Sequence, residues 1–267
     1  MSCTLCCGCS LCFSACIDFQ SGFTKHPGSG KYVGRYNTIP GHYSKTGAAP
    51  LVNLTRASAR SGARGKGSKW SEYDFASWCA VWLLYLVEFS DWDSQSKIGR
   101  GYVDGNSSAI SSGGTDSMTY HTGRAAGTNG KTAVQYRHIE NPYGNVFDFI
   151  DGINFSDGTV YVCLNPASYA DDTAANYTNI GSKIQSDGYI TAIGVAAAMP
   201  WAFFPTGVGG SETTYIPDYA YCYSGWRVLF VGGYWSFGGN AGLFYFYAYD
   251  ASSDAGSDVG ARLLFHP

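Results

Sequence analysis

The sequence predicts an α+β domain. Two segments with helical character, residues 54–63 and 71–89, lie in the first third of the 267-residue chain. Most of the short strand-like segments come later, and they are separated by long stretches rich in glycine and serine. Early helices followed by many short strands and long loops are typical of the α+β class. No internal repeat is visible in the sequence.

The segment 71–89 has the clearest helical pattern. Ser71 is suited to cap its N-terminus, and Glu72 and Asp74 place negative charge in the first turn. Apolar side chains then recur at helical spacing, which predicts one buried face. These side chains are Phe75, Trp78, Cys79, Trp82 and Leu86. Cys79 is therefore expected to be a small core residue.

Strand-like alternation, or a short apolar run bounded by turn residues, marks seven further segments. They are residues 32–36, 146–150, 159–163, 190–195, 227–231, 243–249 and 261–265.

The composition argues against capture of nucleic acid and against membrane insertion. Only 14% of the residues are charged and the formal net charge is −3, so no strong field favours a polyanion. No apolar run reaches the length of a membrane span, and the N-terminus lacks the basic region of a secretory signal. These features fit a cytosolic protein or a virion component assembled inside a cell. The 35 glycines and 21 tyrosines match the residue types of antibody-like contact surfaces. The alternative, which composition alone favours, is a loop-rich β protein whose tyrosines half-fill a core.

Residues 1–30 form a Cys-rich segment with little core-forming pattern, interpreted as an attachment segment. Cys3, Cys6, Cys9 and Cys12 occur as two Cys-x-x-Cys pairs, a spacing that suits tetrahedral zinc coordination. Disulfides or an attachment tail without metal explain the same pattern, so the alternatives stay open.

No resident cofactor is expected. Residues 125–132 fit a relaxed phosphate-loop pattern, but a polar stretch precedes them where a buried strand is needed. Residues 151–158 are rich in oxygen ligands, yet they lack the EF-hand order. Their Asp-Gly pairs favour tight hairpins instead.

A basic run at Arg56, Arg60, Arg64, Lys66 and Lys69 is most simply a solvated face.

Four segments resemble, in order, the formylglycine-generating-enzyme branch of the C-type lectin fold. They are residues 32–36 (YVGRY), 70–76 (WSEYDFA), 141–149 (NPYGNVFDF), and the pair 231–235 (VGGYW) and 260–262 (GAR). The resemblance implies a C-type-lectin-like domain over residues 31–267, with short twisted antiparallel sheets, two helices and long loops.

The departures from that family bear on function. The oxidase branch needs reactive cysteines after the Gly-Gly-x-Trp element, and residues 223–267 contain none. The chain is more similar to the variable proteins of diversity-generating retroelements. In that branch, copying with randomised adenines restricts which residues occur in the variable region. Five residue types fall outside that set, and four of them (Lys, Glu, Gln and Met) are absent from residues 234–258, while the single Trp235 stands where the family has a constant tryptophan. The resemblance therefore implies a variable region there.

The alternation in residues 244–249 agrees with this placement. A strand sends Phe244, Phe246 and Ala248 to one face and Tyr245, Tyr247 and Tyr249 to the other. The tyrosine face is expected to be exposed, because phenolic tips tolerate water. The alternative is a strand that is buried on both faces. The predicted ligand-binding residues are Tyr234, Ser236, Phe237, Asn240, Tyr245, Tyr247, Tyr249, Asp250, Asp254 and Asp258.

The resemblance implies a binding protein without catalytic activity, in a phage tail or, if bacterial, at the cell surface. Its partners would be a host cell-surface protein or glycan, other virion tail proteins, and further copies of itself. The sequence leaves two alternatives open. One is an oxidase or other enzyme on the same fold, and the other is a structural virion protein. Bound calcium or zinc is left open. Arg262 is expected to be a buried cation paired with Asp148 or Asp151.

Overall fold

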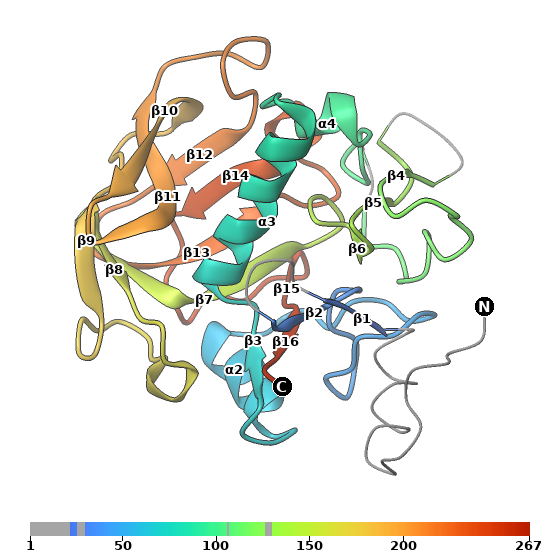
Figure 1. The fold of residues 1–267 in the computed structure, drawn as a ribbon, viewed down its shortest axis with the longest axis horizontal. Coiled ribbons are helices and arrows are strands. Elements are labelled where there is room, and N and C mark those ends of the chain that lie inside the picture. Colours follow the sequence, from blue (N-terminus) through green and yellow to red (C-terminus); the bar gives the residue numbers. More distant parts are fainter. Residues whose placement is uncertain (1–21, 26–29, 106, 126–129) are drawn as a thin grey trace.

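The computed structural model describes residues 22–25, 30–105, 107–125 and 130–267 (Figure 1). The fold is mainly β, with 34% of the residues in strands and 15% in helices. Helices and sheets are both present, as the sequence predicted, but the sheets dominate. The described residues contain three α-helices, one more than expected.

A nine-stranded sheet forms the centre of the molecule (Figure 1). Along the sheet the order is β11-β10-β12-β14-β13-β7-β8-β9, and β15 pairs with β7. The two edges approach each other, since the backbone N–H of Ile184 donates to the carbonyl of Pro205 at 2.9 Å, so the sheet is nearly closed. Its strands are β7 (Phe147–Ser156), β8 (Thr159–Val162), β9 (Thr178–Ser182), β10 (Gly188–Ala196), β11 (Met199–Val208), β12 (Tyr219–Cys222), β13 (Trp226–Gly232), β14 (Gly242–Ala248) and β15 (Val259–Gly260).

Two smaller sheets complete the fold. The first joins strands from both ends of the described chain in the order β1-β2-β16-β3, and the second has the order β4-β5-β6. Because β1 pairs with β2, the packed part of the chain includes residues from the segment 1–30. The bounds are β1 (Phe23–Lys25), β2 (Tyr32–Gly34), β3 (Trp70–Glu72), β16 (Leu263–Phe265), β4 (Gly123–Arg124), β5 (Val134–Tyr136) and β6 (Ile139–Glu140).

All seven predicted strand segments are confirmed at least in part, whereas several strands were missed. The longest missed strand is β11, which carries Pro200 and Pro205. Proline cannot donate to a ladder, which is why strands that contain it lie at sheet edges, and β11 is an edge strand. The Asp157-Gly158 pair forms the predicted tight turn between β7 and β8, with both residues at positive φ. The same prediction is wrong for Asp151-Gly152, which lies inside β7.

The helices are α2 (Arg56–Arg64), α3 (Phe75–Phe89) and α4 (Ser94–Lys97). The prediction that Ser71 caps the long helix is wrong, because Ser71 lies in β3. The cap is Asp74, whose carboxylate accepts from the backbone N–H of Ser77 at 2.8 Å. Helix α3 crosses one face of the large sheet (Figure 1). Its Trp82 ring meets Phe244 of β14 at 5.3 Å between centroids, so the main apolar core lies between this helix and the sheet.

Arg262 is a fully buried cation, as predicted. Its Nε donates to Asp148 at 2.9 Å, and its other nitrogens donate to backbone carbonyls. Cys79 is a buried core residue, also as predicted.

The interpretation of the basic run as a solvated face is wrong for Arg56 and Arg60, which are buried. Both side chains pair with Asp171, and Arg60 also pairs with Asp151 at 2.6 Å. The acids that neutralise them lie about a hundred positions further along the chain, which a local charge pattern does not reveal.

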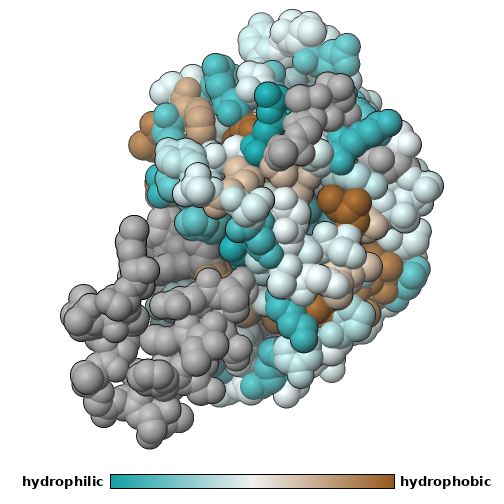
Figure 2. Space-filling model, turned by 90° about the vertical axis from the view of Figure 1, so that its right-hand side faces the viewer, coloured by the Kyte–Doolittle hydropathy of each residue, from teal (hydrophilic) through white to brown (hydrophobic). Residues whose placement is uncertain are grey.

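The surface on the side of β4–β6 is largely hydrophilic. Figure 2 shows strongly hydrophobic residues there only as small patches among polar ones, where described residues are visible. Among the helices that the structure describes, none is both long enough and apolar enough to span a bilayer.

Candidate functional site

The two faces of β14 have the composition that the alternation predicts. Phe244, Phe246 and Ala248 belong to the main core under α3. Tyr245 and Tyr247 belong to a second, separate cluster of aromatic residues. Since successive side chains of a strand point to opposite faces, this second cluster lies on the side of the sheet that α3 does not cover.

A second row of tyrosines, which the sequence analysis missed, lies beside the first. Strand β12 pairs in parallel with β14, and Tyr221 stands opposite Tyr247 in the register. Their rings are 5.3 Å apart, and those of Tyr223 and Tyr249 are 4.8 Å apart. Residues 219–223 read Tyr-Ala-Tyr-Cys-Tyr, the same alternation as in β14, so a local signal for this row does exist.

We call this surface the aromatic face. It comprises the aromatic side chains of the second cluster and the two exposed tyrosines at its end. Its residues are Phe147, Phe149, Tyr219, Tyr221, Tyr223, Phe230, Tyr234, Phe237, Tyr245, Tyr247 and Tyr249.

Burial along the aromatic face is graded, and one prediction is corrected by it. Tyr245 is 0% exposed, Tyr247 is partly buried, and Tyr249 is 40% exposed. The expectation that Tyr245 is displayed to solvent is therefore wrong. Its ring packs against Phe147 and Phe237, at 5.7 and 5.3 Å between centroids. It supports the surface from below.

A pocket of about 370 Å³ opens on the aromatic face. Six of the ten predicted ligand-binding residues line it, all from the segment 234–258, and Phe147 joins them from β7. We call it the aromatic pocket. Its lining consists of Phe147, Tyr234, Phe237, Tyr247, Asp250, Asp254, Ala255, Gly256, Asp258 and Val259.

Packing fixes the walls of the aromatic pocket. Phe147 lies centrally, with ring centroids 5.1 Å from Tyr234, 5.4 Å from Phe237 and 5.4 Å from Tyr247. Tyr234 and Phe237 also contact each other at 4.5 Å. Rings held by several neighbours lose little entropy when a ligand binds, so the walls are preorganised.

The other side of the aromatic pocket is acidic. The Tyr247 hydroxyl donates to Asp250 at 3.2 Å, and Asp254 accepts from the backbone N–H of Ala251 at 2.8 Å. Burial raises the pKa of the Asp250 carboxyl above its ordinary value, and the charges of Asp254 and Asp258 raise it further. The three carboxylates thus repel one another at the rim of the aromatic pocket.

The other four predicted residues lie outside the lining. Ser236 is exposed, and Asn240 accepts a hydrogen bond from the Tyr189 hydroxyl at 2.8 Å. The ring of Tyr249 contacts that of Tyr223 at a tilt, and Tyr245 is buried. Of the predicted residues, six therefore line one pocket and four do not. Asn240 and Tyr249 flank it, Tyr245 lies buried beneath it, and Ser236 is exposed.

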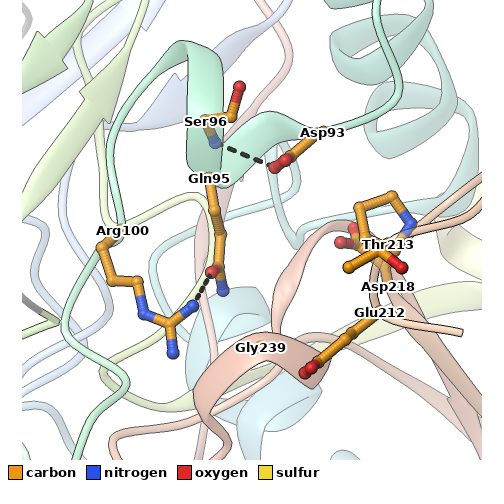
Figure 3. A pocket seen from close by; sticks show the side chains of 9 residues that line it. Asp93, Gln95, Ser96, Arg100, Glu212, Thr213, Asp218 and Gly239 are labelled. Carbon is orange, nitrogen blue, oxygen red and sulfur yellow. Dashed lines mark hydrogen bonds between the residues drawn. The ribbon is translucent and has the colours of Figure 1, made fainter.

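A second pocket, of about 400 Å³, is polar and contains none of the predicted residues. Arg100 and Gln95 lie opposite Glu212 and Asp218 across it (Figure 3). Arg100 donates to Gln95 at 2.8 Å and pairs with Asp104 at 2.6 Å. Burial raises the pKa of Asp218 well above its ordinary value. The cation of this pocket, Arg100, is therefore already engaged by Gln95 and by Asp104, which lies outside the lining.

The thiols bear on the enzyme alternative. Cys79, Cys163 and Cys222 are buried and free. Burial raises the pKa of the Cys79 and Cys222 thiols, whereas nucleophilic cysteines need a lowered one. Within the described ranges, no group of three His, Cys, Asp or Glu side chains is placed to hold a metal ion. The zinc candidates Cys3, Cys6, Cys9 and Cys12 lie outside the described residues.

Comparison of the chain with models of known protein families and with curated proteins gives no match. The function is therefore inferred from the geometry of the molecule.

Proposed function

We propose that this chain is a binding protein without catalytic activity and that the aromatic face, with its pocket, is the contact surface. One observation carries the proposal. Residues chosen from the sequence as a recognition surface converge in space, since six of the ten line one pocket. A concave site with aromatic walls and a few polar groups is the usual form of a ligand site.

The proposed scaffold is a C-type-lectin-like domain of the formylglycine-generating-enzyme branch. Support comes from the way three of the four resembling segments contact Arg262, which lies in the fourth. Arg262 donates to Asp148 and to the carbonyls of Gly34 and Asn141. Its own carbonyl accepts from the backbone N–H of Tyr73 at 2.8 Å. One buried cation therefore links segments that lie more than two hundred positions apart.

The proposed setting is a phage tail or a cell surface, where the aromatic face contacts a host protein or glycan. Tyrosine suits such a role, because its ring supplies a large contact area with few rotatable bonds and its hydroxyl stays hydrated. Tyr223 and Tyr249, which are 52% and 40% exposed, would make the first contacts. Loss of one central tyrosine should weaken binding by about 1–2 kcal/mol.

Adsorption of the labelled protein to a panel of intact bacterial strains tests this function. The variant Tyr223→Ser/Tyr247→Ser/Tyr249→Ser should lose at least about tenfold in adsorption to any strain that binds the wild type. Its control is Tyr120→Ser/Tyr215→Ser, which removes two exposed tyrosines elsewhere. Equal adsorption by all three proteins would refute the assignment of the surface.

Light scattering on the same proteins addresses the structural alternative. If the wild type forms an oligomer and the triple variant is monomeric, the aromatic face is a subunit interface and not a receptor site. Diversification has a separate test in the DNA. We expect a reverse-transcriptase gene nearby and an imperfect repeat of the codons for residues 234–262.

A further inference from the structure

We propose that the aromatic pocket binds the guanidinium group of an arginine side chain on the partner protein. This inference rests on the proposed binding function and names the chemical class that the pocket takes. It follows from the combination of ring walls and unpaired carboxylates in one concave site of about 370 Å³.

The aromatic walls of the pocket favour a cation. Phe147, Tyr234, Phe237 and Tyr247 surround the aromatic pocket and contact one another through Phe147. The face of an aromatic ring carries negative potential, and it attracts cations most strongly where water is excluded. Beneath these rings lies Tyr245, which is fully buried and does not itself line the aromatic pocket.

The carboxylates of the aromatic pocket favour a cation as well. Asp250, Asp254 and Asp258 contribute three acidic groups to the lining, and no Lys or Arg lines the aromatic pocket. None of the ion pairs between described residues includes any of the three. Arg227 is close enough to act on Asp250 electrostatically, but its guanidinium lies over the ring of Tyr223. A cation from outside would therefore relieve the repulsion between the carboxylates.

The geometry favours an organic cation over a metal ion. Among the described residues, no three acidic, His or Cys side chains are placed to hold a metal ion, and this includes the three carboxylates of the aromatic pocket. Guanidinium is planar, stacks on rings, and offers five donors that can reach separated acceptors. It also forms paired hydrogen bonds with a carboxylate. Arginine therefore matches both halves of the site better than lysine does.

The test is a titration of the full chain with N-acetyl-argininamide, with binding measured by calorimetry or NMR. N-acetyl-citrullinamide is the matched probe, because it keeps the shape and removes the charge. We expect citrulline to bind at least about tenfold more weakly, since hydrogen bonds to charged groups contribute roughly 1.5–3 kcal/mol. Asp250→Asn and Asp258→Asn should each weaken arginine binding by a similar factor. Asp91→Asn, which removes a carboxylate after the C-terminal end of α3 and outside the lining of the aromatic pocket, should not.

The outcomes separate this inference from the proposed function. Equal binding of arginine and citrulline, or no effect of the aspartate variants, would overturn the guanidinium assignment. A lysine amide that binds as well as arginine would overturn the preference for a planar cation. If bacterial adsorption depends on the tyrosines but argininamide neither binds nor competes, only the present inference fails. If adsorption is independent of the tyrosines, the proposed function fails, whatever the amide does.

Discussion

The two faces of strand β14 differ in chemistry and in how completely they are covered. On the side of α3, the side chains of Phe244, Phe246 and Ala248 are almost fully buried against the helix. On the other side, burial declines along the strand from Tyr245 through Tyr247 to Tyr249. None of the described α-helices covers this side (Figure 1), and aromatic side chains of neighbouring strands and loops pack on it instead. One strand thus contributes to a core and to a surface at once.

The comparison shows why tyrosine and phenylalanine alternate there. Phenylalanine on the covered face gains the full free energy of burial, whereas a half-covered phenylalanine would leave an apolar surface in water. Tyrosine tolerates partial burial, because its hydroxyl stays hydrated at the rim. Tyr245 is the exception, since its hydroxyl is buried.

The largest expected effect is a contrast in stability between adjacent residues. Phe246→Ala should lower the free energy of unfolding by about 3–5 kcal/mol, because it leaves a cavity beside Trp78 and Phe155. Tyr247→Ala, on the aromatic face, should cost only about 1–2 kcal/mol. Urea unfolding measures both. Equal losses would show that the two faces are equally part of the core.

A second contrast concerns charge on the covered side. Asp218 is 1% exposed and accepts from the backbone N–H of Phe244 at 2.7 Å. Burial raises its pKa above the unfolded value near 3.8, so the folded state holds the proton more tightly. This group therefore stabilises the fold less as the pH rises from about 3.8 through the raised pKa.

Asp218→Asn removes this dependence. The free energy of unfolding of the variant minus that of the wild type should increase as the pH rises, whatever the offset at low pH. Urea unfolding between pH 4 and pH 8 measures this difference. A difference that stays constant would mean that Asp218 titrates normally in the folded state.

A third, smaller effect isolates the hydroxyl of Tyr245. Tyr245→Phe removes a buried polar group without a partner, so we expect the stability to rise by about 1 kcal/mol. Thermal or urea unfolding checks this expectation. A loss of stability would indicate that the hydroxyl is hydrogen-bonded, for example to water, so that the interior of the aromatic face contains a satisfied polar group.

The smallest effect on stability is expected for Tyr249→Ala. The side chain is 40% exposed and contacts mainly Tyr223 and Tyr247, so the change should cost less than about 1 kcal/mol. Its effect on bacterial adsorption should exceed its effect on stability. A large loss of stability with unchanged adsorption would show that Tyr249 contributes to the core and not to the contact surface.

Much of the site was predictable from β14 and the loop after it. The period of two in residues 244–249 assigned each side chain to the correct face, because pleated backbone allows no other arrangement. Six of the predicted residues line the aromatic pocket. What the pattern did not settle was exposure. Tyr245 lies under Phe147 and Phe237, which come from other segments of the chain.

The sequence by itself determined seven of the strand segments, most of the long helix and the two faces of β14, since these follow from local periodicity. The pairing of Arg262 with an acid follows from the cost of burying an unpaired charge. Only the tertiary structure decided that β12 lies parallel to β14 and doubles the row of tyrosines. The same holds for the burial of Arg56 and Arg60 by distant aspartates. The physical reason is that pairing between remote segments depends on the summed packing of the whole chain, which no single window of residues contains.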